Sequence, residues 1–466
     1  MFLSAYDQGA SARIRVCMDA TTRALLFLGW CILLLSVPML DGQSLPQPSN
    51  ETGEIPDEIS SAGFILATTE YGNFKCSTSV ELPRSEDIKG YIFCAYPVED
   101  QAELPRLSKA LSVCRECDWL TGVDLSAVDC LDANSLRALS KCHQLTLLRV
   151  HSSQRLTVGD WSLILTLTNV RSFTFYDEDC CDGEMISKVL SRSILDELVI
   201  CNNVHWLRIP SVREGLSKSS GLSRFGVCVA NDDQLKLCID CVASVTALRS
   251  LSVRLPARLG PSVISELTRL PNIRELDVDL AWDAADIGRE KELSKQMAEC
   301  LGNAQNVGKL EKVSLTGARK VDERFIESLA RMPALHSLRL ISCEIGESAL
   351  LPLSTSSIRS LQLAGIGQTS VSVLSKLITD SKFKTLALEF SESQNFTQEI
   401  MAAIGKNVGI KRLVLSKLAL LGESDVRKVA EGGQRSFLLT GCSQFSVDWA
   451  KQVSLETKSE ILIIAD

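Results

Sequence analysis

An apolar triplet at positions 1, 4 and 6 of a unit of about 25 residues recurs along most of this 466-residue chain. Leu335, Leu338 and Leu340 form one copy. The twelve clear copies start at Leu120, Leu145, Val170, Leu195, Leu222, Leu248, Ile273, Leu310, Leu335, Ile358, Phe383 and Ile410, at intervals of 25, 25, 25, 27, 26, 25, 37, 25, 23, 25 and 27 residues. A chain that repeats one short unit in near-constant register stacks those units, so the sequence predicts a solenoid rather than separate globular domains.

The spacing inside each unit predicts its local structure. Positions 4 and 6 differ by two residues, so both side chains point to one face of a short strand. Between the strands, apolar residues recur at steps of three and four, as in Phe325, Ile326, Leu329 and Met332, which is typical of one buried helix face. We therefore predict a parallel sheet lining the inside, helices outside and one continuous core. Weaker copies at Ile88/Tyr91/Phe93, Phe437/Leu439 and Ile461/Ile463 suggest about 12–14 repeats.

These triplets, with residues 334–343 as the best single copy, resemble the leucine-rich repeat family over roughly residues 110–466. The repeat length is similar to that of the ribonuclease-inhibitor-like and cysteine-containing types, which have helices on the convex side. Asn203 and Cys343 match the Asn or Cys that the family usually places at position 9. The resemblance implies an α/β horseshoe and, most often, a protein ligand.

Segments outside the repeats divide the rest of the chain. We predict a signal peptide or membrane anchor over residues 1–44, a linker over 45–61, an N-terminal cap over 62–118 and the solenoid over 119–466, with a helical insertion at 283–305. Residues 24–40 are uncharged and apolar, between Arg23 and Asp41, and Met18 offers a later start that gives an ordinary signal-peptide shape.

Cleaved signal and retained anchor both place residues 45–466 outside the cytosol; the alternative is a cytoplasmic protein. Asn50 and Asn395 begin glycosylation sequons. For an exported protein, the cysteines clustered around the cap are candidates for one or two disulfides: Cys76, Cys94, Cys114 and Cys117. Other cysteines, including the Cys238-x-x-Cys241 pair, are expected to be buried as small hydrophobic residues.

Composition and motifs weigh against several classes of function. The net charge is −8, which disfavours general affinity for nucleic acid. Only four histidines are present, and no catalytic triad, phosphate loop or zinc-protease signature occurs. We expect no enzymatic activity, no cofactor and no metal, although an enzyme site within residues 62–110 is a third alternative.

The predicted ligand surface is the concave sheet face, formed by positions 3, 5 and 7. Its candidate residues are Arg149, His151, Tyr176, Arg224, Arg254, Asp277, Lys312, Arg339, Gln362, Glu389 and Arg412. A second candidate is a basic file at position 2, at one edge of the sheet: Arg171, Arg249, Arg274, His336, Arg359, Lys384 and Lys411.

The function predicted from these features is a monomeric, exported or membrane-anchored scaffold that recognises a protein. Its contact with a membrane would be limited to an uncleaved apolar segment. The alternative is an intracellular adaptor such as a ubiquitin-ligase substrate receptor.

Overall fold

The structure is a computed structural model. It describes residues 64–70, 73–77, 88–95, 104–117, 120–126, 128, 131–151, 157–176, 183–192, 194–256, 266–267, 270–281, 295–296, 299, 309–319, 321–346, 348–365, 370–389, 398–416, 421–442 and 444–464. The residues predicted as a signal or anchor (1–44) and as a linker (45–61), together with the sequon residues Asn50 and Asn395, lie outside these ranges.

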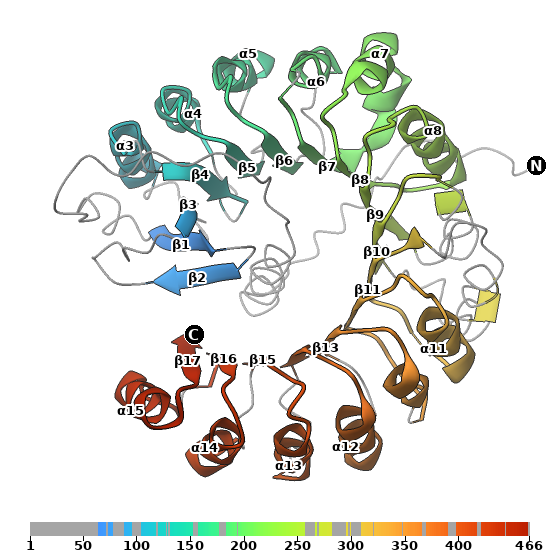
Figure 1. Cartoon of the computed structure of the whole chain (residues 1–466). Helices are drawn as coiled ribbons and strands as arrows, with labels where there is room; N and C mark the ends of the chain where they lie inside the picture. Colours follow the sequence, from blue (N-terminus) through green and yellow to red (C-terminus); the bar gives the residue numbers. More distant parts are fainter. Residues whose placement is uncertain are drawn as a thin grey trace, which may run out of the picture.

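Parallel strands stacked in chain order form one curved sheet (Figure 1). Within the described ranges, fourteen successive strands from β4 to β17 pair in parallel, and β3 pairs with β4 in the same direction. Strand β1 pairs antiparallel with both β2 and β3 and so completes the N-terminal end of the sheet. The strands are β1 (Phe64–Glu70), β2 (Asn73–Ser77), β3 (Ile88–Ala95), β4 (Leu120–Leu125), β5 (Leu147–His151), β6 (Ser172–Tyr176), β7 (Glu197–Asn203), β8 (Arg224–Cys228), β9 (Ser250–Pro256), β10 (Glu275–Ala281), β11 (Lys312–Thr316), β12 (Ser337–Ile341), β13 (Ser360–Ala364), β14 (Thr385–Glu389), β15 (Arg412–Ser416), β16 (Ser436–Thr440) and β17 (Glu460–Ile464).

Short helices cover the convex side, so the strands line the inside of the curve (Figure 1). The α-helices are α3 (Leu104–Cys114), α4 (Ala133–Leu139), α5 (Val158–Ser162), α6 (Gly183–Leu190), α7 (Pro210–Lys218), α8 (Asp232–Val242), α11 (Glu323–Ala330), α12 (Val371–Asp380), α13 (Gln398–Lys406), α14 (Glu423–Glu431) and α15 (Val447–Thr457). Three 3-10 helices are η2 (Leu163–Thr166), η3 (Val204–Arg208) and η7 (Leu351–Thr355).

The repeated triplets form the core between sheet and helices. All residues of the twelve clear triplets are buried, none more than 6% exposed. Position 4 of each unit faces position 4 of the next, as in Val313, Leu338 and Leu361 on β11–β13. On α11 the apolar face Phe325 and Ile326 is also buried. The prediction of a parallel-sheet solenoid with outer helices is confirmed.

Two units differ from the predicted pattern. The shortest interval, 23 residues between the triplets that begin at Leu335 and Ile358, contains the 3-10 helix η7 in place of an α-helix. The copy proposed at Ile88/Tyr91/Phe93 is shifted: Phe93, and not Tyr91, pairs with the position-4 residue Val123, and the register is irregular between Tyr91 and Ile92. Strand β3 thus already belongs to the parallel sheet, inside the segment predicted as a cap.

Side-chain caps begin several outer helices where the sequence changes from loop to helical periodicity. The Asp322 carboxylate accepts a hydrogen bond from Phe325 N, and Ser370 and Ser446 cap α12 and α15 in the same way. Such caps satisfy backbone donors that a helix start leaves free. Within the predicted insertion 283–305, the described residues Lys295, Gln296 and Glu299 are helical.

Two cysteines close the loops that follow β12 and β16. The Cys343 Sγ lies 3.4 Å from Leu315 O and 3.3 Å from Ile341 O. Cys442 occupies the equivalent place, with its Sγ 3.9 Å from Leu415 O and 3.4 Å from Thr440 O. Cys343, at position 9 of its unit, therefore lies within bonding distance of loop carbonyls, and Cys442 is a second instance in the weak copy around Phe437.

No helix among the residues that the structure describes is long and apolar enough to cross a bilayer. The apolar run at 24–40 lies outside those residues.

Candidate functional site: the concave face and its basic edge

The strand pleat divides each unit between core and concave face. On β9, Leu251, Val253 and Leu255 are buried, whereas Ser252 and Arg254 between them face the inside of the curve. Because neighbouring strands are in register, side chains at positions 3, 5 and 7 form three rows that cross the sheet. The separation of strands is about 4.8 Å, so charged residues on next-neighbour strands can reach each other.

An acidic residue on β10 joins cations from β8 and β11. Glu275 Oε1 lies 2.7 Å from Lys312 Nζ on β11, and Glu275 Oε2 lies 3.6 Å from Arg224 Nη2 on β8. The three side chains are only 15–27% exposed. Partial burial strengthens such attractions and fixes the long side chains.

Asp279 and Asp277 extend this arrangement along β10. Arg254 Nε lies 3.4 Å from Asp279 Oδ2, and Ser252 Oγ donates to Asp277 Oδ2 at 3.1 Å. Arg254 and Asp279 are the more accessible pair, with side chains 57% and 42% exposed. Desolvation raises the pKa of Asp279, and Arg254 opposes that shift. We call Arg224, Arg254, Glu275, Asp279 and Lys312 the central charge array.

Arg339 on β12 is a buried cation beside this array. It is 8% exposed, and its Nε donates to Gln362 Oε1 at 2.8 Å. Desolvation lowers the pKa of the Arg339 guanidinium, while Asp277 opposes that shift. Its Nη2 is buried without a hydrogen-bond partner among the described residues. Two residues predicted for the concave face, Arg339 and Gln362, are thus brought together, but Arg339 presents little surface to a ligand.

Toward the N-terminal end of the sheet, Arg149 is likewise buried and paired with another side chain of the protein. Its Nη1 lies 3.2 Å from Asp124 Oδ2, and both side chains are about 95% buried. His151 on β5 is partly buried, and Tyr176 ends β6 with its side chain outside the described set. Because Arg149 is buried, the row of accessible side chains predicted along the concave face is interrupted at this position.

Toward the C-terminal end, the concave face becomes more apolar. Position 5 on β14–β17 is occupied by Ala387, Val414, Leu438 and Leu462. Glu389 and Arg412 are half-buried at its margins. Burial lowers the pKa of Arg412, and Glu460 opposes the shift. These two candidates do not join the central charge array.

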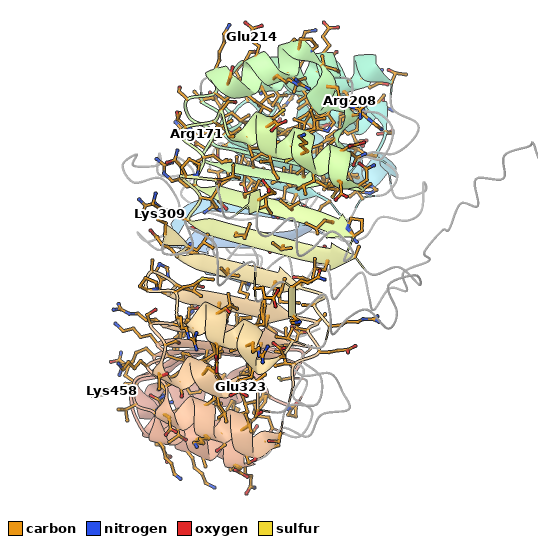
Figure 2. All side chains as sticks on the ribbon, turned by 90° about the vertical axis from the view of Figure 1, so that its right-hand side faces the viewer. Arg171, Arg208, Glu214, Lys309, Glu323 and Lys458 are labelled. Carbon is orange, nitrogen blue, oxygen red and sulfur yellow. The ribbon has the colours of Figure 1, made fainter. Side chains whose placement is uncertain are left out.

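The cations at position 2 lie along the edge of the sheet at which the strands begin. The upstream and downstream parts of this row differ in whether acidic side chains lie beside the cations. In the upstream part, acids accompany the cations: Arg171 lies 3.7 Å from Asp196, and Glu311 contacts both Arg274 and His336. Arg249 donates to the carbonyls of Thr246 and Leu248 instead. In Figure 2, Arg171, Lys309 and Lys458 mark this edge, and Arg208 lies toward the other.

In the downstream part, Arg359, Lys384 and Lys411 directly precede β13, β14 and β15. All three are exposed, and within the described part of the chain none forms an ion pair or a side-chain hydrogen bond. Backbone hydrogen bonds link the three residues from one repeat to the next, since Lys384 N donates to Arg359 O and Lys411 N donates to Lys384 O. The sequence identified this row of cations. Only the structure shows which of them lie beside acidic side chains and which do not.

The described cysteines whose side chains are placed form no disulfide with one another, and most are buried. Cys114 and Cys117 are among them, while the side chains of Cys76 and Cys94 lie outside the described set, so the cap disulfides stay a prediction. The burial predicted for Cys238 and Cys241 is confirmed. Burial raises the pKa of the Cys238 thiol to about 12, which keeps it protonated and unreactive at neutral pH.

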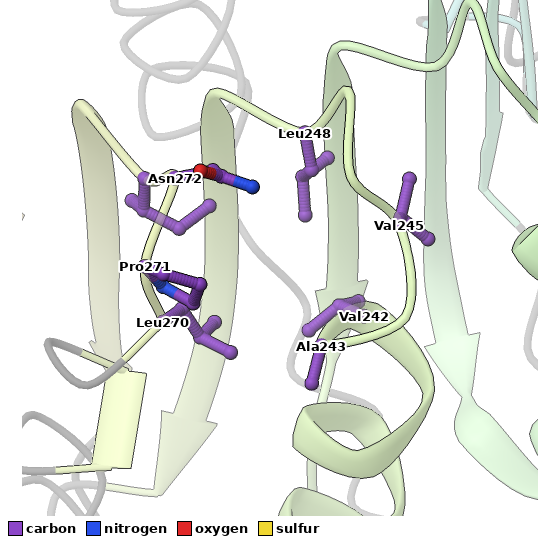
Figure 3. Close-up of a pocket in the computed structure, with 8 residues that line it drawn as sticks. Val242, Ala243, Val245, Leu248, Leu270, Pro271 and Asn272 are labelled. Atoms are coloured by element: carbon purple, nitrogen blue, oxygen red, sulfur yellow. The ribbon is translucent and has the colours of Figure 1, made fainter.

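No group of three or more potential metal-binding side chains occurs in the described part of the chain. A small recess between successive turns is lined by apolar residues and Asn272 (Figure 3). The Asn272 amide donates to Thr246 O and thereby ties the two turns together. The recess is therefore a joint between repeats and not a ligand site.

Sequence reasoning missed Glu275, the residue that joins Arg224 and Lys312 in the central charge array. Its signal was available, because Glu275 occupies position 3 of the unit that contributes Asp277. Aligning the units in register places it between Arg224 and Lys312, with one strand separating it from Arg224.

The stacked units, in-register triplets and outer helices define a leucine-rich-repeat solenoid. No protein-family model and no curated protein sequence matches the chain. Among solved structures, an internalin, InlF, from Listeria monocytogenes is similar, with 16% identity, a TM-score of 0.30 and coverage of 72% of this chain and 84% of that one.

Two further solved structures show a similar degree of likeness. Rad7, from the yeast Rad7 and Elc1 complex, has 15% identity and a TM-score of 0.43, with coverage of 78% of this chain and 88% of that one. Internalin C2 from Listeria monocytogenes has 15% identity and a TM-score of 0.27, with coverage of 55% and 92%. Likeness at this level says nothing about binding partners, so function is argued from the side chains.

Proposed function

We propose that this chain is a non-enzymatic recognition scaffold whose concave sheet face binds a protein. The observation that carries the proposal is the central charge array, in which five charged side chains from β8–β11 are held on a rigid curved sheet. Charges fixed before binding favour a partner of complementary pattern and reduce the ordering cost of association.

Arg254 and Asp279 are the contact residues that this proposal singles out. Both are accessible and carry opposite charges, and Asp279 lies four residues after Glu275 on β10, whose pair with Lys312 is less exposed. A ligand surface with an acidic group facing Arg254 and a basic group facing Asp279 would match this arrangement. Arg149 and Arg339 are both buried, so we assign them to the packing of the sheet and not to contact with a ligand.

The test is affinity capture with the full chain from extracts or secretions of its source, followed by quantitative binding of each captured protein. Exchanging the charges with Arg254→Glu and Asp279→Lys preserves the pair while reversing its pattern. We expect at least about a tenfold loss of affinity for a true ligand. The matched control exchanges the helix pair Glu214→Lys and Lys218→Glu on the convex side; equal losses in both variants would reject the concave site.

We further propose export or membrane anchoring through residues 1–44, supported by the uncharged apolar run at 24–40. N-terminal sequencing of the mature chain separates cleavage from retention, since Arg13 persists only if no cleavage follows the apolar run. Sensitivity of the natural protein to a glycosidase, lost in Asn395→Gln, would exclude the intracellular adaptor alternative. A mature chain without glycan whose apolar segment faces the cytosol would reject export.

A further inference from the structure

A local excess of positive charge marks the edge of the sheet at β13–β15. Arg359, Lys384 and Lys411 are joined there by Lys382, just before β14, and by Lys406, the last residue of α13. All five are exposed, and none forms an ion pair or a side-chain hydrogen bond with another described residue. We call these five residues the basic edge.

Nearby acids do not neutralise the basic edge. Asp380 ends α12 and Glu431 ends α14, and both are exposed, yet neither forms an ion pair with any described residue. Upstream on the same edge, Asp196 and Glu311 do contact Arg171, Arg274 and His336. Because the whole chain has a net charge of −8, this unmatched patch opposes the general charge of the protein.

Backbone geometry gives the basic edge a regular spacing. Successive position-2 residues are linked by backbone hydrogen bonds of 2.7–2.8 Å, from Lys384 N to Arg359 O and from Lys411 N to Lys384 O. Neighbouring strands lie about 4.8 Å apart, so the three cations form a line roughly 10 Å long. An extended segment repeats its side chains on one face about every 6.8 Å, so two or three acidic residues span that line.

An exposed apolar side chain lies among these cations. Val408 is 65% exposed, in the turn between Lys406 and Lys411. A hydrophobic residue at a site of one charge is suited to a polypeptide that combines acidic and apolar side chains. It has no counterpart in a nucleic-acid backbone, and a flat anionic membrane along the edge would also meet the acids Asp196 and Glu311.

We propose that the basic edge binds an acidic segment of a partner protein, with an apolar residue of that segment contacting Val408. This site is separate from the concave face and does not depend on the function proposed above. Arg359, Lys384 and Lys411 attract the carboxylates, and the fixed spacing of the strands selects a short, densely acidic segment.

The experiment is fluorescence anisotropy with the full chain and a labelled peptide of glutamate and aspartate residues around one central leucine. Binding should weaken steeply as salt rises. The variant Arg359→Glu/Lys384→Glu/Lys411→Glu should bind at least about tenfold more weakly. The matched control Arg208→Glu/Lys236→Glu/Lys428→Glu makes the same charge change at exposed positions elsewhere and should remain within about twofold.

A second comparison tests the apolar contact. Val408→Ser should weaken binding of the leucine peptide about threefold, and should have no effect when serine replaces the leucine of the peptide. Circular dichroism melts check that every variant is folded. Equal losses in the two triple variants, or no binding by the wild type, would overturn the proposal. Binding to phosphatidylserine vesicles without binding to the peptide would do the same.

Discussion

The central strands and the C-terminal strands both display cations, but they differ in what accompanies them. On β8–β11, Glu275 contacts Arg224 and Lys312, and Asp279 contacts Arg254. Along the edge at β13–β15, Arg359 and Lys384 have no acidic neighbour within ion-pair distance among the described residues. Matched charges hold one another in place, whereas unmatched charges retain their full attraction for a partner.

The largest expected effect tests whether the two regions share one core. Leu251→Ala on β9 and Leu386→Ala on β14 each remove a fully buried side chain. Each should lower the free energy of unfolding by about 2–5 kcal/mol, measured by denaturant titration. A loss confined to one region, seen as a second transition, would show that the two regions unfold independently.

A smaller effect concerns the thiol behind the central strands. Burial raises the pKa of Cys238 from 9.0 to about 12, so the native state keeps a proton that the unfolded state releases. Stability from this group is therefore complete below pH 9 and falls as pH rises from 9 toward about 12, by about 1.4 kcal/mol per pH unit.

Cys238→Ala isolates that contribution, because the slope of unfolding free energy against pH should become shallower by about that amount. Helices α12–α14 contain no cysteine, so no thiol in these helices contributes to the pH dependence of the unfolding free energy. An identical slope in wild type and variant would contradict the assignment.

The charge pairing itself gives a further contrast. Glu275→Gln leaves Arg224 and Lys312 facing each other on a half-buried surface. We expect a loss of about 1 kcal/mol in unfolding free energy, reduced by high salt. Glu431→Gln, at an exposed acid, is the control and should change stability by less than about 0.5 kcal/mol. A Glu275 effect no larger than this control would remove the basis for calling the array preorganised.

The smallest effect is expected at the basic edge. Lys384→Gln should alter unfolding free energy by less than about 0.5 kcal/mol, and any change should be stabilising because Arg359 and Lys411 are close in the stack. Thermal melts at low and high salt would measure it. A clear destabilisation would mean that Lys384 has a structural partner and is not free for binding.

The sequence predicted the fold because its dominant signal is a repeated burial pattern, and each triplet residue has the same environment in every unit. The candidate site was less predictable. Residue spacing identifies which side chains face inward, but the exposure of Arg149 and Arg339 depends on neighbours in other strands. Asp124 lies 25 residues before Arg149, and Gln362 lies 23 residues after Arg339. Such partners become visible only when the repeats are aligned in register.

The succession of neighbouring strands also has a mechanical consequence. From β4 to β16, each parallel strand is hydrogen-bonded to the strand that precedes it and the strand that follows it along the chain. A tensile force on β17 would therefore load the contacts with β16 before those further in, and extension would proceed by detaching one repeat after another. The molecule would lengthen in small steps and could shorten again by re-adding repeats onto the remaining stack.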